Sequence, residues 1–329
     1  MKTILKGIAV GACALSLGAA AQAQDTADWP NDLTIGTASQ GGTYFVYGSG
    51  LAAFIGETLG INASAEVTGG PVQNATLVET EDLLMGQVTM GPAYEAWTGQ
   101  SELAPDLEHK NLRALYPMYQ TQFQVITLAD SGITSVADLE GKRVSVGPAG
   151  GTPGTYWPRF LETLGVNANI SYAGAADAAT QLKDGLIDAF AFAAGLPIPA
   201  FTQLSVENDV VMFGFTPEEQ ASIVENHPVA AYTIEAGVYD GHDYEQPTVS
   251  MWNFGITNAS MPDSMAYEIT KLVLENNDRM LQIHSAADET LIENWGSNTF
   301  LPFHPGAVQY YAENGIEIPE ELSGCVEAC

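Results

Sequence analysis

The stretch Leu33-Thr-Ile-Gly-Thr-Ala-Ser-Gln-Gly-Gly-Thr-Tyr-Phe45 decides the fold of this chain. A short apolar run ends at Gly36, a loop of Thr, Ser and Gly follows, and apolar residues at helical spacing begin at Val46. We therefore predict a strand, a glycine loop and the start of a helix. The first amides of a helix have no partner inside it and carry partial positive charge, so an anion binds there without a cationic side chain.

Several residues of this loop are candidate ligand contacts. Gly41 and Gly42 let a ligand approach the backbone closely, while Thr37, Ser39 and Thr43 add hydroxyl donors. The alternative is an ordinary strand-to-helix loop in which Thr43 or Ser39 caps the helix. This stretch by itself leaves both interpretations open.

Two more glycine turns of the same kind follow along the chain. In the first, Gly69-Gly-Pro71 separates an apolar run from a helix, and Gln73 and Asn74 lie in the first helical turn. Their side-chain amides either reach a ligand or cap the helix. In the second, Pro148-Ala-Gly-Gly-Thr-Pro-Gly-Thr155 follows the strand that ends at Gly147. It is the richest of the three turns in glycine and proline.

Arg159 is the only cation on the helix side of these turns. It is a candidate for a bidentate bond to a ligand carboxylate, but a surface salt bridge with one of the many acidic residues is the interpretation we favour. Tyr94 is either a core residue or a platform for a ligand. Gly195, beside Leu196 and Pro197, is a further candidate contact.

Strand-like and helix-like segments alternate from Asp32 to Phe215, which predicts an α/β architecture with largely parallel sheets. Two strands, 112–118 and 123–128, are expected on either side of the polar residues 119–122, a candidate crossing between two lobes. The strand expected at 248–256 returns to the first lobe, and an amphipathic helix is expected over 262–280. We therefore predict lobe 1 from residues 24–121 with 248–329, and lobe 2 from 122–247.

The N-terminus has the pattern of a secretory signal peptide over residues 1–23, with Lys2 and Lys6 ahead of an apolar run and cleavage expected near Ala23. We therefore expect an exported, periplasmic protein. After cleavage 8 basic residues remain against 40 acidic ones, a net charge of −32. That charge argues against nucleic-acid or anionic-membrane partners and suggests a saline environment as a hypothesis. Export also favours a disulfide between Cys325 and Cys329.

No catalytic constellation is present: there is no nucleophile elbow, no zinc-protease helix and no phosphate-loop lysine. Five histidines are scattered along the chain, and three of them, beside Pro or Gly, are expected to cap turns. We therefore expect a binding protein that is not an enzyme, with no metal or cofactor. The alternatives are a ligand-sensing domain for a membrane signalling partner and an enzyme built on a binding-protein fold.

Six segments in this order resemble the TAXI family, the extracytoplasmic solute receptors of one class of TRAP transporters. They are Gly36–Tyr44, Gly69–Asn74, Asp130–Ile133, Asp138–Val144 with Val146-Gly147, Leu182–Ala189 and Pro302–Ala307. The resemblance implies a two-lobed periplasmic-binding-protein fold of type II that closes like a hinge. It also implies a small organic anion or amino acid as ligand, such as a glutamate-like amino acid or 2-oxoglutarate, passed by a monomer to a TRAP-type permease.

The same resemblance implies which residues contact the ligand. They belong to the turn with Thr37, Ser39, Gly42, Thr43 and Tyr44, the turn with Gly70, Gln73 and Asn74, and the turn with Gly150, Gly151, Thr152 and Thr155. Pro71 and Pro153 depart from the family pattern, and each removes a donor. The residues themselves favour the same mechanism, with three amide-lined helix starts around one cleft and hinges near Gln122 and Gln246.

Overall fold

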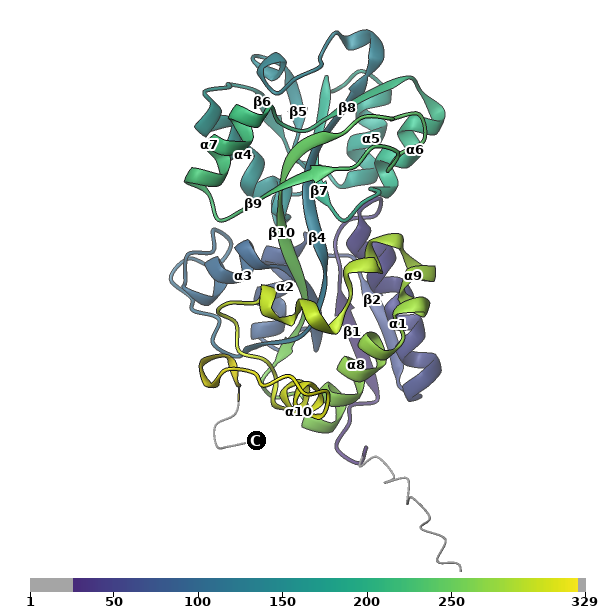
Figure 1. The fold of residues 1–329 in the computed structure, drawn as a ribbon, viewed down its shortest axis with the longest axis vertical. Helices are drawn as coiled ribbons and strands as arrows, with labels where there is room; N and C mark the ends of the chain where they lie inside the picture. The colour runs from purple at the N-terminus through teal and green to yellow at the C-terminus, as the bar shows by residue number, and fades with distance from the viewer. Residues whose placement is uncertain (1–25, 325–329) are drawn as a thin grey trace, which may run out of the picture.

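A computed structural model describes residues 26–324, so the predicted signal peptide and the cysteine pair lie outside the described residues. Figure 1 shows two α/β lobes, one above the other. Two long strands run through both lobes, β4 (Leu112–Leu128) and β10 (Gln246–Asn258). Within residues 26–324, no helix is long and apolar enough to cross a membrane.

Lobe 1, the lower body in Figure 1, holds the N-terminal and C-terminal elements. Its strands are β1 (Asp32–Gly36), β2 (Asn62–Glu66) and β3 (Met85–Thr89). Its helices are α1 (Thr43–Leu59), α2 (Pro71–Glu79), α3 (Met90–Trp97), α8 (Asp263–Glu275), α9 (Asn277–Ile283), α10 (Pro305–Glu313) and the short turns η3 (Ser285–Glu289), η4 (Ile292–Ser297) and η5 (Glu320–Leu322).

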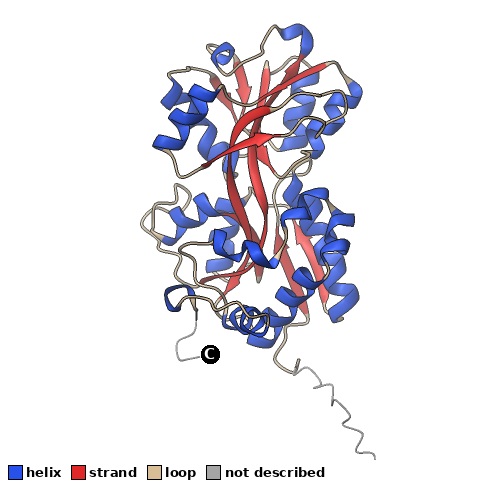
Figure 2. Ribbon diagram, viewed as in Figure 1, coloured by secondary structure: helices blue, strands red, loops and turns tan. Residues whose placement is uncertain are grey.

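Lobe 2 is formed by the middle of the chain. Its strands are β5 (Arg143–Ser145), β6 (Asn169–Ser171), β7 (Ala189–Ala194), β8 (Val210–Phe213) and β9 (Ala230–Ile234). Its helices are α4 (Thr152–Leu164), α5 (Ala175–Lys183), α6 (Pro199–Glu207), α7 (Pro217–Asn226) and the short turns η1 (Ala129–Ser131) and η2 (Ala137–Leu139). In both lobes the helices surround the strands (Figure 2), which confirms the predicted α/β class.

The strands follow one another in the order β2-β1-β3-β10-β4-β7-β5-β6, with β8 paired to β4 and β9 to β10. Each lobe thus repeats one pattern, a parallel trio followed by a long strand that arrives from the other lobe and pairs antiparallel to it. The parallel trios match the prediction, whereas the crossing pair β4 and β10 is antiparallel. Because carboxyl ends of parallel strands meet at one edge, the turns that follow them face the junction of the lobes.

Two predicted elements differ from the structure. Residues 112–128 form one continuous strand rather than two, because backbone pairing with the neighbouring strands continues through residues 119–122, of which all but the partly buried Gln120 are buried. The helix expected over 262–280 is broken at Asn276, whose backbone leaves the helical region (φ −121°, ψ 43°). Consecutive asparagines are weak helix formers, which explains the break.

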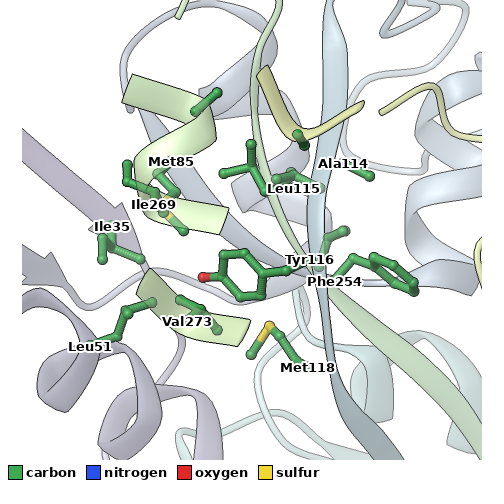
Figure 3. Close-up of a cluster of buried hydrophobic side chains, with 14 of the residues drawn as sticks. Ile35, Leu51, Met85, Ala114, Leu115, Tyr116, Met118, Phe254, Ile269 and Val273 are labelled. Atoms are coloured by element: carbon green, nitrogen blue, oxygen red, sulfur yellow. The ribbon is translucent and has the colours of Figure 1, made fainter. Parts of the chain in front are cut away.

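The core is divided in the same way as the lobes. One buried cluster gathers side chains from lobe 1, and Figure 3 shows Tyr116 of β4 beside Ile269 and Val273 of α8. Two further clusters fill lobe 2. Along β4 the core changes from lobe 1 to lobe 2 between Tyr119 and Phe123, and along β10 it changes back between Met251 and Phe254. We propose these two places as the crossings, the second a few residues beyond the predicted boundary at 247/248.

Candidate functional site

Each of the three predicted glycine turns leads from a strand into a helix. The N-caps are Gly42 for α1, Gly70 for α2 and Gly151 for α4, and none of the three accepts a hydrogen bond through a side chain. The suggestion that Thr43 or Ser39 caps α1 is therefore wrong. Glycine has no side chain to cap with, so the first amides of these helices are left for other partners.

Two of these turns meet around a cavity of about 30 Å³ between the lobes. Six of the predicted contact residues line it: Ser39, Gly42, Thr43, Tyr44, Gly151 and Thr152. The turn before α2 contributes only Pro71, which has no amide hydrogen to donate. Such a volume holds about two water molecules, since one water needs roughly 10–15 Å³ measured in this way.

Hydrogen bonds between the lobes close the structure over this cavity. From lobe 2, the amides of Ala175, Ala176 and Ala200 donate to Ser39 Oγ, Gln40 O and Gly41 O, each at 3.0 Å. From lobe 1, Thr43 Oγ1 donates to Gly195 O at 2.5 Å and Val72 N donates to Gly150 O at 3.1 Å. The structure is therefore a closed arrangement in which the lobes satisfy one another's polar groups.

A network of hydroxyl groups forms the floor of the cavity. Tyr44, Thr89 and Thr121 donate to Oδ1 of Asn253 at 2.6, 2.8 and 3.0 Å. Thr152 of α4 joins this network from lobe 2 by donating to Thr89 Oγ1 at 2.7 Å. Burial raises the pKa of Tyr44 well above its usual value, and the bond with Thr89 offsets only part of that rise. The Tyr44 hydroxyl therefore stays protonated at any physiological pH.

Other predicted residues support the turns without lining the cavity. Asn74 is fully buried, and its Nδ2 donates to the carbonyls of Thr37 and Gln87 at 2.7 and 2.9 Å. Thr37 donates through Oγ1 to Glu66 O at 2.6 Å, and Gln73 Oε1 accepts the amide of Gly69 at 2.6 Å. These bonds hold the first two turns beside one another, so these three side chains position the backbone.

Four predicted glycines lie where the lobes touch: Gly70, Gly150, Gly151 and Gly195. Gly70 (φ +113°) packs so closely that an added Cβ would lie 2.9 Å from Gly151 Cα and 3.0 Å from Gly150 O. The carbonyl oxygen of Gly195 accepts a hydrogen bond from the Thr43 hydroxyl, and Gly195 packs against the Tyr119 ring. Thr155, also predicted, is buried one helical turn into α4 and does not line the cavity.

Arg159 does not reach the cavity, because two carboxylates of lobe 1 bind it. Its guanidinium donates to Glu95 at 2.5 Å and to Glu102 at 2.9 Å, and the Tyr156 hydroxyl donates to Glu95 at 2.9 Å. Burial would lower the pKa of Arg159, but the bonds to both carboxylates outweigh burial and raise it. The ion-pair interpretation favoured from the sequence holds, and the pair bridges the two lobes.

Tyr94 lies on the outer side of the same region. It is 47% exposed and packs edge to face against Phe300, with ring centroids 5.2 Å apart. It borders a separate hollow of about 310 Å³ with Trp252 rather than the closed cavity. Neither of the two interpretations made from the sequence fits this position, because the ring is neither buried in the core nor beside the cavity.

Nine residues that line the cavity were not predicted: Ala38, Pro71, Thr89, Thr121, Pro148, Pro153, Phe192, Ala193 and Ala194. Asn253, which organises the floor, was also missed. Polar residues inside apolar strand runs carried a usable signal at Thr89, Thr121 and Asn253, since a buried polar group needs a partner. Phe192, Ala193 and Ala194 lacked such a signal, because their sequence is typical of any buried strand.

The cavity is uncharged. Among the described residues, those that line it include no Asp, Glu, Lys, Arg or His. The polar groups around it come from the first turns of α1 and α4 and from the hydroxyl side chains that line it. Within residues 26–324, no three His, Cys, Asp or Glu side chains gather in the way that metal ligands do.

A model of the NMT1-like family matches residues 35–315, nearly all of both lobes. That family differs in name from the TAXI family that the sequence motifs resemble, and the TAXI assignment stays a prediction.

Known structures resemble this one at low sequence identity. A structure described as a periplasmic transporter aligns with a TM-score of 0.53 and 12% identity, covering 79% of this chain and 87% of that one. The ligand-binding core of GluR0 with L-glutamate aligns with a TM-score of 0.47 and 13% identity, covering 79% of this chain and 98% of that one. The aliphatic sulphonate binding protein SsuA from Escherichia coli aligns with a TM-score of 0.44 and 17% identity, covering 86% of this chain and 83% of that one. At 12% identity, the alignment with the periplasmic transporter shows a shared fold and leaves the ligand open.

Proposed function

Because the chain belongs to the NMT1-like family, we propose that it is an exported solute receptor, not an enzyme. In this proposal it binds a small carboxylate between its lobes and delivers it to a membrane permease. The observation that carries the proposal is the uncharged cavity between the glycine-capped N-termini of α1 and α4, which come from opposite lobes.

The binding chemistry follows from the helix ends. A carboxylate between α1 and α4 accepts hydrogen bonds from amides of both lobes, and the two helix dipoles favour its negative charge. The ligand then joins the lobes. No lysine or arginine is needed, which suits a chain with 10 basic and 40 acidic residues.

Binding requires the lobes to separate first. The closed cavity of about 30 Å³ does not hold a five-carbon acid, and the cross-lobe bonds of Thr43 and Val72 occupy groups beside it. An incoming ligand therefore replaces these hydrogen bonds between the lobes with hydrogen bonds to itself. Rotation about β4 and β10 accounts for opening, since these strands link the two lobes.

The finer assignment rests on the resemblance to TAXI receptors. We propose a glutamate-like amino acid or a C5 dicarboxylate such as 2-oxoglutarate as ligand, a TRAP-type permease as partner and the periplasm as location. Titration calorimetry with glutamate and 2-oxoglutarate, combined with small-angle scattering, tests this. We expect heat of binding and a change in radius of gyration with at least one acid, and neither signal with any organic acid or amino acid would contradict the receptor proposal.

Thr43 offers a focused test of the amide-donor role. Thr43→Pro removes the first amide of α1, yet proline suits this helical position and Gly42 already has the extended backbone that precedes proline (φ −95°, ψ 157°). Thr43→Val is the control, since it removes only the hydroxyl that bonds Gly195. We expect Thr43→Pro to weaken ligand binding at least ~10-fold beyond Thr43→Val, the effect of about 1.4 kcal/mol. Equal affinities would show that the amide does not bind the ligand.

A further inference from the structure

Asn253 is placed to control the floor of the cavity. It lies on β10, fully buried, where the pairing register with β4 shifts between Trp252 and Phe254. Such irregularities re-aim side chains and are common beside binding sites. Its Nδ2 donates to Tyr119 O at 2.6 Å, which fixes the amide so that Oδ1 faces the hydroxyls of the floor.

The bonds to Asn253 determine where the hydroxyl protons point. Tyr44, Thr89 and Thr121 each have one proton, and all three approach Oδ1 within 3.0 Å. A carbonyl oxygen has two lone pairs, so two of the three protons are committed to Asn253 at any moment. The oxygens of those two hydroxyls then offer only lone pairs to a ligand, although one lone pair of Thr89 Oγ1 already accepts the Thr152 hydroxyl. The floor is therefore predominantly a hydrogen-bond acceptor.

The opposite side of the cavity has the reverse polarity. The first turns of α1 and α4 present backbone amides, which only donate. A ligand that satisfies both sides carries a carboxylate for the amides and a hydrogen-bond donor for the floor. An oxo group has no proton to donate, so at the floor it would face the lone pairs of the hydroxyl oxygens without forming a hydrogen bond. Leaving such a buried polar group unpaired costs free energy of binding.

We propose that Asn253 makes this receptor selective for acids that carry a hydroxyl or amino donor over the corresponding oxo acids. This inference rests on the proposed function and deepens it, because it separates glutamate-like ligands from 2-oxoglutarate. Asn253 acts as a positioning residue, since it orients the hydroxyls through which the ligand is recognised.

Matched acids test the selectivity. Dissociation constants are measured by calorimetry for two series that differ only at carbon 2: 2-oxoglutarate, 2-hydroxyglutarate and glutamate, and pyruvate, lactate and alanine. We expect the hydroxy or amino member of the series that binds to be at least ~10-fold tighter than the oxo member. The comparison between hydroxy and amino members identifies which donor is used. Equal or tighter binding of the oxo acid overturns the inference and leaves the receptor proposal intact. If none of the six acids binds, the inference and the proposed glutamate-like or C5 ligand are both overturned, and the wider set of organic acids and amino acids then tests the receptor proposal.

Variants of the network test the role of Asn253. Asn253→Leu removes the acceptor and releases the hydroxyl protons toward the ligand, so we expect the preference over the oxo acid to fall at least ~10-fold. Asn258→Leu is the control on the same strand, because that buried side chain bonds Val78 O, Glu79 O and Ser260 N and does not line the cavity. An unchanged preference in Asn253→Leu overturns the proposal.

A milder variant keeps the test available if Asn253→Leu does not fold. Thr121→Val preserves shape and leaves two hydroxyls for the two lone pairs of Asn253 Oδ1, so no spare proton remains for an oxo group. We therefore expect the preference for donor-bearing acids to rise several-fold. A fall in the preference would contradict the assigned proton directions.

Discussion

At the scale of single residues, hydrogen bonds to defined partners explain the positions of many buried polar side chains. His304 is an example at the start of α10, where its Nδ1 accepts the amide of Gly306 at 3.3 Å and caps the helix. This confirms for His304 the capping role expected from the sequence. Only a neutral imidazole can accept this bond, and burial lowers the pKa of His304 to about 4.

That pKa predicts a loss of stability in acid. Between its ordinary value of 6.5 and about 4, the unfolded chain binds a proton at His304 that the folded protein does not. The free energy of unfolding therefore falls as the pH drops through this window, by up to about 3 kcal/mol. Urea unfolding at pH 7, 5 and 4 measures the loss.

The control for this prediction is His304→Asn, which keeps a capping side chain that does not titrate. Its unfolding free energy is expected to depend less on pH over the same window. If the wild type and His304→Asn lose equal stability, His304 does not contribute to the acid sensitivity.

At the scale of elements, the loop between β1 and α1 makes close contact with the other lobe. Gly41 (φ +86°) faces the start of α5, and an added Cβ would lie 2.9 Å from Ala176 N and 3.3 Å from Ala175 Cβ. Its carbonyl also accepts the amide of Ala200. Glycine is therefore required here by the approach of the other lobe as well as by its backbone angle.

Gly41→Ala should hold the lobes apart. Gly237→Ala is the matched control, because Gly237 has nearly the same angle (φ +83°) and no atom within 4 Å of an added Cβ. Both variants should lose about 1–2 kcal/mol from left-handed backbone strain. Only Gly41→Ala should also weaken ligand binding and enlarge the radius of gyration in scattering. Equal ligand affinity in both variants would mean that this contact does not limit closure.

At the scale of the whole molecule, negative charge dominates. The full chain has a formal net charge of −30, and the ion pairs of Arg143 with Asp188 and of Lys183 with Glu207 neutralise little of it. Repulsion among so many acidic groups destabilises the compact state and weakens as salt screens it. The Arg159 pair with Glu95 is distinct because it attracts one lobe to the other.

Thermal stability should therefore rise with salt. From about 0.01 M to about 1 M NaCl the Debye length falls from roughly 30 Å to roughly 3 Å, which removes most long-range repulsion. We expect the melting temperature to increase by ~5 °C, as about 2 kcal/mol does in a large domain. A triple variant of the exposed residues Asp240, Asp243 and Glu245 to their amides should show a smaller increase. A melting temperature that falls with NaCl would contradict this account.

Features that depend on neighbouring residues in the chain could be predicted from the sequence. Glycine and proline restrict the backbone locally, so the three strand-to-helix turns and their helix starts followed from Gly42, Gly70-Pro71 and Gly151. The alternation of apolar segments predicted the α/β class for the same reason. The same local patterns predicted that all three turns contact the ligand, whereas the turn before α2 contributes only Pro71 to the cavity lining.

Which of these residues contact one another depends on how distant segments of the chain pack. Tyr44 and Asn253 are 209 residues apart in the chain, and their bond depends on how β10 crosses between the lobes. Likewise, the amide of Val72 donates a hydrogen bond to Gly150 O of the other lobe. Arg159 of lobe 2 forms ion pairs with Glu95 and Glu102 of lobe 1. Contacts of this kind arise from packing between distant segments, which no local pattern of residues specifies.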